Sequence, residues 1–437
     1  MSTRPSRSIS ATSRVLIRWR GMGALLAVAF YSLFFAAHHR FHNTPVYMTD
    51  GVLFGSRTQT VFNDLIALRE GDHRSIGAEH PAFTLLHQPA AQLIIKGLQF
   101  LGLDVNSARK HGVAVLTCLA GALGVVMVYH ALLWGGVGAL RCILLAAIYG
   151  AGTCAWIVVP LPETWTFAGL GLAAVAAVAA RGPLARWWLH LLAAVYAMSC
   201  FVGNVIPVLL LALVRCAQDT AAAQKLSARP LVTALAAAAI TFGLANLQRV
   251  VFPRSAALPT QLLEWREADA GWTATAETPA RVAREVFISN IVAPKAITTK
   301  TQGAARGRAR VVLDEDASWS GFDLQTGVGT AWLLLLVLGG AGLVWRAVDD
   351  PFTLGIAAVL VWSIAALPWY GSPDRLLLLA CLWTPMVVLA VGLGLERTLV
   401  RWPRLAVPVT LLLAAFLAAQ ITRNWIFLQD VARMVRL

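Results

Sequence analysis

Long apolar segments separated by polar connections make up most of this chain. The clear ones lie near residues 21–37, 112–133, 139–158, 163–180, 187–216, 230–251, 326–346, 352–369, 375–395 and 405–427. A run of roughly 20 apolar residues can cross about 30 Å of hydrocarbon as a helix. Because the runs are continuous, and because backbone groups in lipid must bond internally, they predict helices and not the alternating strands of a membrane barrel.

Two segments decide how many helices cross the membrane. Residues 187–216 are long enough for two short helices, with Gly203 and Asn204 as the break between them. Residues 82–103 are apolar enough to cross, but they include a histidine, a proline and a lysine. We expect 82–103 to lie on the outer surface, which predicts an all-α polytopic membrane protein with about 11 transmembrane helices, or 10 to 12.

Two long polar stretches interrupt the apolar pattern. The first, residues 38–111, follows the first apolar segment, and the second covers residues 252–323. No fixed-period repeat and no separate soluble domain stand out, so we interpret residues 1–437 as one membrane domain. We expect both stretches to be extracytoplasmic loops, the first with surface helices.

The basic residues indicate the orientation. An N-terminal group precedes any acid: Arg4, Arg7, Arg14, Arg18 and Arg20. If 82–103 stays on the surface, the arginine-bearing connections at 181–186, 215–229 and 397–404 fall on the same side as this group. That bias is typical of cytoplasmic loops. We expect a cytoplasmic N-terminus, an uncleaved first helix, and an inner or plasma membrane location.

Composition agrees with this class. The chain is 58% hydrophobic and 13% charged, with mean hydropathy +0.67, which is far from the usual composition of soluble domains. The net charge of +14 is explained by basic residues at helix ends. We therefore expect membrane lipids, and no nucleic acid, as partners.

The six cysteines fall in or at the edge of apolar runs. They are Cys118, Cys142, Cys154, Cys200, Cys216 and Cys381. None lies in either polar stretch. We therefore expect small buried side chains, and neither disulfides nor a metal site.

The first polar stretch carries the candidate chemistry. Asp50 follows the first apolar segment by about a dozen residues, where a carboxylate can deprotonate a hydroxyl or hold a divalent cation. The alternative for Asp50 is a solvated acid that opens an Asp-Gly turn with Gly51. Asp64 and Arg57 are further candidates in the same stretch.

The dipeptide His80-Pro81 is the second candidate. Proline favours the first helical position and extends the residue before it, so Pro81 predicts a helix from residue 82 with His80 held at its start. An ordinary helix start is the alternative. Further along, Glu163 is either a second outer acid or a carboxylate favoured by the positive end of a helix.

The order of these features resembles the GT-C superfamily of polytopic glycosyltransferases, in its protein-mannosyltransferase and aminoarabinose-transferase branch. The likeness rests on a first helix, an outer loop with the early acid Asp50, and then His80-Pro81-Ala82-Phe83. It also includes Pro162-Glu163-Thr164-Trp165 and Tyr370-Gly371-Ser372-Pro373-Asp374-Arg375. This chain departs from the branch in lacking a second acid after Asp50 and a second proline after Pro81.

The resemblance implies transfer of a sugar from a polyprenyl-phosphate carrier on the extracytoplasmic face. Asp50 would be the base, with Asp64, His80 and Glu163 beside it, and Asp50 would hold a divalent cation if one takes part. An arginine fork matches phosphate oxygens. The residues implied for the lipid phosphate are Arg375, Arg109, Lys110 and Arg57.

Other features support alternatives. In the second stretch a basic run, from Lys295 to Arg310, suits either a solvated loop or a lid over a phosphate. A transporter or flippase of a lipid-linked or anionic substrate, and an enzyme resembling O-antigen ligases, remain alternatives, as does a scaffold. His38, His39 and His42 end the first helix, where metal binding competes with the commoner role of interface anchors.

Overall fold

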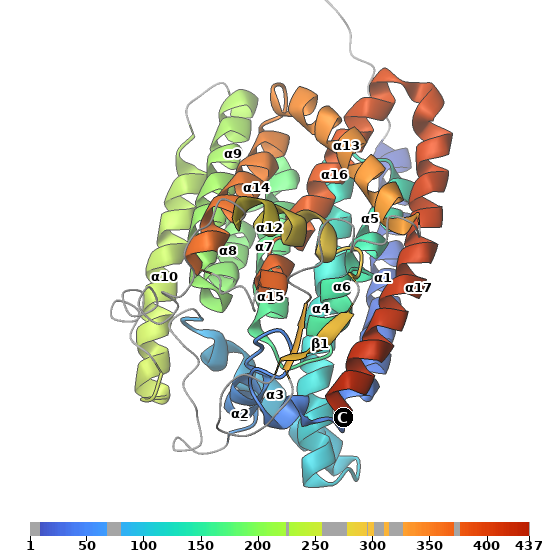
Figure 1. Ribbon diagram of the computed structural model, residues 1–437. Coiled ribbons are helices and arrows are strands. Elements are labelled where there is room, and N and C mark those ends of the chain that lie inside the picture. The colour runs from blue at the N-terminus through green and yellow to red at the C-terminus, as the bar shows by residue number, and fades with distance from the viewer. Residues whose placement is uncertain are drawn as a thin grey trace, which may run out of the picture.

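A computed structural model describes residues 9–67, 80–223, 227–255, 278–294, 296–300, 310–313, 327–370 and 376–436. Helices stand side by side through most of it, while α2, α3 and β1 gather toward one end (Figure 1). The longer helices are α1 Ile9–Phe41, α3 Phe83–Phe100, α4 Val105–Trp134, α5 Ala139–Gly150, α7 Thr164–Ala180, α8 Trp187–Cys200, α9 Val205–Ala223, α10 Arg229–Val251, α13 Val328–Ala347, α14 Pro351–Tyr370, α16 Thr384–Arg401 and α17 Ala406–Arg436.

Shorter elements connect them. These are η1 Pro45–Met48, α2 Thr58–Ile66, α6 Thr153–Val158, η3 Gly182–Leu184, η4 Val202–Asn204, α12 Thr278–Arg284, the π-helical turn η5 Glu285–Ser289, α15 Leu376–Cys381 and η9 Pro403–Leu405. Strands β1 Ala296–Lys300 and β2 Arg310–Leu313 form an antiparallel pair. This hairpin is a small exception to the expected all-helical fold.

Six helical segments within the described residues are long and apolar enough to cross a membrane. They are Gly21–Phe41, Val105–Trp134, Val202–Ala222, Arg229–Val251, Val328–Ala347 and Pro403–Arg436. Four shorter apolar helices, α5, α7, α8 and most of α14, stand among them. These lengths are those of a helical membrane protein. The count of about 11 crossings stays a prediction.

Helices α1 and α4 run antiparallel. At one end the Lys110 ammonium donates to the His42 carbonyl over 3.0 Å. At the other end Gly23 faces His130, whose Nε2 would lie 3.5 Å from an added Cβ. The chain between α1 and α4 therefore leaves and re-enters the bundle at the same end. This arrangement agrees with the expectation that residues 82–103 do not cross.

The opposite end of the bundle is rich in arginine contacts. Arg141 makes a 2.8 Å ion pair with Glu396, which joins the start of α5 to α16. Arg181, after α7, lies over the ring of Trp134 at the end of α4. Arg346 donates to the Gly135 carbonyl and so ties α13 to the end of α4. These contacts bring the ends of α4, α7, α13 and α16 together.

The break expected inside 187–216 is confirmed. Helix α8 ends at Cys200 and α9 begins at Val205, with η4 between them. The buried Asn204 amide donates to the carbonyls of Ala197 and Ala168, at 3.0 and 3.3 Å. Asn204 thus satisfies backbone groups that the broken helix leaves open.

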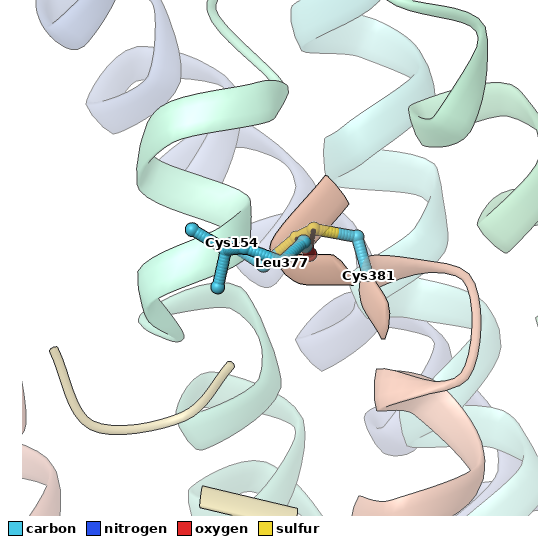
Figure 2. The surroundings of a disulfide bond; sticks show 3 residues. All are labelled: Cys154, Leu377 and Cys381. Carbon is cyan, nitrogen blue, oxygen red and sulfur yellow. Dashed lines mark hydrogen bonds between the residues drawn. A yellow bond between two sulfur atoms is a disulfide. The ribbon is translucent and has the colours of Figure 1, made fainter. Parts of the chain in front are cut away.

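The expectation that no cysteine forms a disulfide is wrong for one pair. Cys154 of α6 and Cys381 of α15 are joined, with Cα atoms 5.5 Å apart, across 227 residues of sequence (Figure 2). Both sulfurs lie beside the Leu377 carbonyl. Each cysteine looks like an ordinary apolar-run residue, so the local pattern carries no sign of the pairing. The other four are free thiols.

Candidate functional site

The buried Glu163 carboxylate is the centre of the candidate site. It is 1% exposed and stands directly before α7. Its side chain does not cap α7; instead Oε1 accepts the backbone N–H of Arg57 over 2.7 Å. Arg57 is the N-cap residue directly before α2, so the carboxylate lies at the positive end of that helix. The first polar stretch is thereby fixed to the start of α7.

His80 is the next residue of this site. Its Nδ1 donates to the Cys200 carbonyl, because a carbonyl oxygen can only accept. In the neutral ring Nε2 then accepts the Thr164 hydroxyl over 2.9 Å. Trp165 packs edge-on against the ring, with centroids 5.3 Å apart. Both ring nitrogens of His80 are therefore bonded to protein groups. Through its Nε2, the ring holds Thr164, the residue after Glu163, in place.

The helix after His80 starts later than expected. Helix α3 begins at Phe83, with Ala82 at its N-cap and Pro81 outside it. The Ala82 N–H donates to the Ser199 carbonyl over 3.2 Å, so this stretch of backbone is held against the end of α8. The expectation that Pro81 is the first helical residue is therefore wrong, because tertiary contacts delay the first turn.

Asp50 lies at the surface. Its carboxylate accepts the Thr60 N–H over 3.0 Å and the Thr60 hydroxyl over 2.6 Å. Thr60 is in the first turn of α2, where an acid stabilises unpaired N–H groups. Gly51 follows with φ 79°, and its N–H donates to the Ser56 carbonyl. Asp50 therefore opens a turn with Gly51, which is the structural alternative that the sequence offered. Its side chain remains exposed at the surface. Asp64 lies buried on α2.

The second polar stretch contacts the first. The Phe54 N–H donates to the Val311 carbonyl over 2.9 Å, and the Val311 N–H donates to the Val52 carbonyl over 2.8 Å. Strand β2 thus lies along the loop that carries Asp50. Phe54 has φ 48°, a left-handed conformation that is unusual for a phenylalanine. Most of the basic run between Lys295 and Arg310 is outside the described residues.

The residues expected to bind the lipid phosphate do not all lie together. Lys110 lies at the end of α1, against the His42 carbonyl, and Arg109 precedes it near the start of α4. Arg57 contributes its backbone N–H to Glu163. Arg375 falls outside the described residues. The structure therefore brings Arg57, His80 and Glu163 to one place and leaves Arg109 and Lys110 with α1.

The sequence did not predict an ion pair in which the glutamate is buried. Arg284 and Glu285 approach to 3.3 Å where α12 passes into the π-helical turn η5. Glu285 is 3% exposed, and burial raises the pKa of its carboxyl, while Arg284 opposes that rise. π-Helical turns are common at functional sites. The signal available in the sequence was an Arg-Glu pair flanked by apolar residues.

No metal centre is preformed in the part of the chain that the structure describes. There, no three His, Cys, Asp or Glu side chains direct their donor atoms at one ion as they stand. A divalent cation at Asp50 stays a prediction. No family model matches the chain, and no curated protein is significantly similar to it.

Proposed function

We propose that this chain is a membrane-embedded glycosyltransferase that moves a sugar from a polyprenyl-phosphate carrier to an acceptor on the extracytoplasmic face. The observation that carries the proposal is the burial of the Glu163 carboxylate and its hydrogen bond to the Arg57 N–H. A buried carboxylate, a buried histidine and, through Arg57, the outer loop with Asp50 meet at the start of α7. Burying a carboxylate costs free energy unless hydrogen bonds offset it, so its placement calls for a role.

The proposed chemistry divides between the two acids. Asp50 has an outward-facing carboxylate, which suits it to take the proton of an acceptor hydroxyl. Glu163 stabilises the loop that carries Asp50 through the Arg57 N–H. The departing phosphate needs cationic partners, for which Arg375, Arg109 and Lys110 are the proposed ligands. Strand β2 lies along the same loop, which supports a lid formed by the second stretch.

The distribution of charge supports the proposed orientation. Arginines gather at the bundle end that joins α4, α7, α13 and α16, as expected of a cytoplasmic face. Asp50 belongs to the connection between α1 and α4, at the opposite end. An N-terminus in the cytoplasm and a site outside an inner or plasma membrane follow from this proposal.

Mass spectrometry can identify the donor and the acceptor. Lipid-linked sugars and glycans would be compared between cells with and without the protein. Loss of one glycan with accumulation of its lipid-linked sugar is expected. An unchanged profile of both pools under expression of the protein would contradict sugar transfer.

Variants then test the assigned roles in proteoliposomes that contain the donor found in this way. Asp50→Asn should abolish transfer while expression stays normal. The matched control is Asp349→Asn, which removes a carboxylate at the arginine-rich end, where it pairs with Arg397. Unchanged transfer by Asp50→Asn would refute the base. Loss in both variants would point to a general defect.

One observation favours transport as the second candidate. The pair Arg284–Glu285, whose glutamate is buried, lies where α12 passes into the π-helical turn η5, and η5 packs among α13, α15 and α16 while α12 packs against α14. Ionisable residues buried among membrane helices are typical of transport pathways. Movement of a fluorescent lipid-linked sugar across liposomes without acceptor, and its loss in Glu285→Gln, would support this alternative over transfer.

A further inference from the structure

Four histidines form one cluster where α1 meets α4. His38 and His39 come from the last turn of α1, His42 directly follows that helix, and His111 comes from α4. All six distances between their ring centroids fall between 5.3 and 5.7 Å. Four imidazoles around a tetrahedral ion with metal–nitrogen bonds of about 2.0–2.1 Å would have centroids about 5.2 Å apart. The rings therefore already have nearly the spacing of such a site.

Hydrogen bonds fix the lone pair of His38. The Tyr47 hydroxyl donates to the Pro160 carbonyl over 3.0 Å, so its oxygen must accept from His38 Nδ1, 2.7 Å away. The Nε2 atom of the neutral ring then carries the lone pair. This atom lies 3.2 Å from Nδ1 of His111. Two nitrogens bound to one tetrahedral zinc ion would lie about 3.3 Å apart, so a shared proton and a shared metal need almost the same geometry.

His42 is oriented in a similar way. Its Nδ1 lies 3.0 Å from the His39 carbonyl, which can only accept, so Nδ1 carries the hydrogen and Nε2 the lone pair. Metal-bound histidines usually donate their other N–H to a carbonyl or another polar group, as His38 and His42 do here. His38 and His42 are also four residues apart and so share a helix face.

We propose that this cluster is a binding site for a divalent transition-metal ion, zinc above all. His38, His42 and His111 supply the three principal ligands, and His39 is the fourth. Neutral imidazole nitrogens suit zinc, copper and nickel far better than magnesium or calcium. As they stand, no three of the described His, Cys, Asp or Glu side chains could hold a metal ion, so binding requires side-chain rotation within the cluster. His39 is exposed and His42 partly so, which gives the ion access and the rings room to turn.

The proposal is independent of sugar transfer, and its test needs no transferase activity. Protein without a polyhistidine tag is purified in detergent, treated with a chelator, desalted, and titrated with Zn²⁺ and with Co²⁺. One tightly bound zinc per chain is expected, together with the strong visible absorption of tetrahedral cobalt. Absence of stoichiometric zinc binding by the wild-type protein would overturn the proposal.

Three variants locate the site. His111→Gln should lose tight binding, whereas His130→Gln, which changes another histidine of α4, should keep it. Tyr47→Phe removes the hydroxyl that orients His38 and should weaken binding by about 10–100-fold. Retention of full affinity by His111→Gln, or equal loss in the control, would overturn the assignment. If His111→Gln fails to fold, X-ray absorption of zinc on the wild-type protein decides: several imidazole ligands support the site, and oxygen-only coordination refutes it.

Discussion

The contact between α13 and α16 permits a sharp test of the packing. Gly342 of α13 faces Gly394 of α16 so closely that an added Cβ at Gly342 would overlap the Gly394 carbonyl oxygen and lie 2.5 Å from the Thr398 hydroxyl. Gly340, two residues earlier on the same helix, has nothing within 4 Å of an added Cβ. Alanine at these two positions should therefore have opposite effects on stability.

The magnitude follows from two opposing contributions. Replacing a helical glycine with alanine stabilises by about 0.8–1.0 kcal/mol through helix propensity. Overpacking a close contact costs about 1–3 kcal/mol, occasionally more, and the obstacle at Gly342 is backbone that cannot rotate away. Gly342→Ala should lose about 1–2 kcal/mol net, and Gly340→Ala should gain up to about 1 kcal/mol. Their difference is then about 2–3 kcal/mol.

Thermal unfolding in one detergent, followed by tryptophan fluorescence, measures this difference. The expected order of Tm is Gly340→Ala at or above wild type, and Gly342→Ala clearly below it. A Tm for Gly342→Ala equal to that of Gly340→Ala would show that α13 and α16 are not in backbone contact. The reverse order would refute the packing of the two helices altogether.

Two further predictions concern long-range links. Asn424→Ala should destabilise by about 2–5 kcal/mol in the same assay, because the buried Asn424 amide bonds the Ala293 N–H and two carbonyls; the control Asn246→Ala, on an exposed face, should stay within about 0.5 kcal/mol. Thiol titration of the denatured, unreduced protein should find four free thiols among the six cysteines, and a count of six would disprove the bond between Cys154 and Cys381.

The local sequence predicted those helices and breaks that depend on the residues of one segment alone. Apolar length predicted the helices, and Gly203-Asn204 predicted the break between α8 and α9. The apolar segment near residues 112–133 predicts a helix from about residue 112, whereas α4 begins at Val105. The signal was present, because the Asp104 carboxylate accepts the N–H groups of Asn106 and Ser107 as an N-cap does.

Partners far apart in sequence could not be predicted in this way. Asn424 satisfies carbonyls up to 273 residues away, and Cys154 finds Cys381 across 227 residues. The residues around Cys154 and Cys381 resemble those of an ordinary apolar helix, and the polar residues beside Asn424 do not indicate which carbonyls it binds. Only the packing of α17 and α15 against α6 creates these contacts, and that packing depends on the whole bundle.

The contacts of Glu163 could not be predicted from its place in the sequence. Its place before α7 favoured either a site acid or a carboxylate at the positive end of its own helix. In the structure it accepts the N–H that opens α2, 106 residues earlier, so it serves another helix than the one it precedes. Replacement by glutamine would keep an acceptor oxygen but remove the charge that favours a helix N-terminus. Loss of transfer in Glu163→Gln with unchanged Tm would assign the charge to chemistry, whereas a lowered Tm would assign it to anchoring the Asp50 loop.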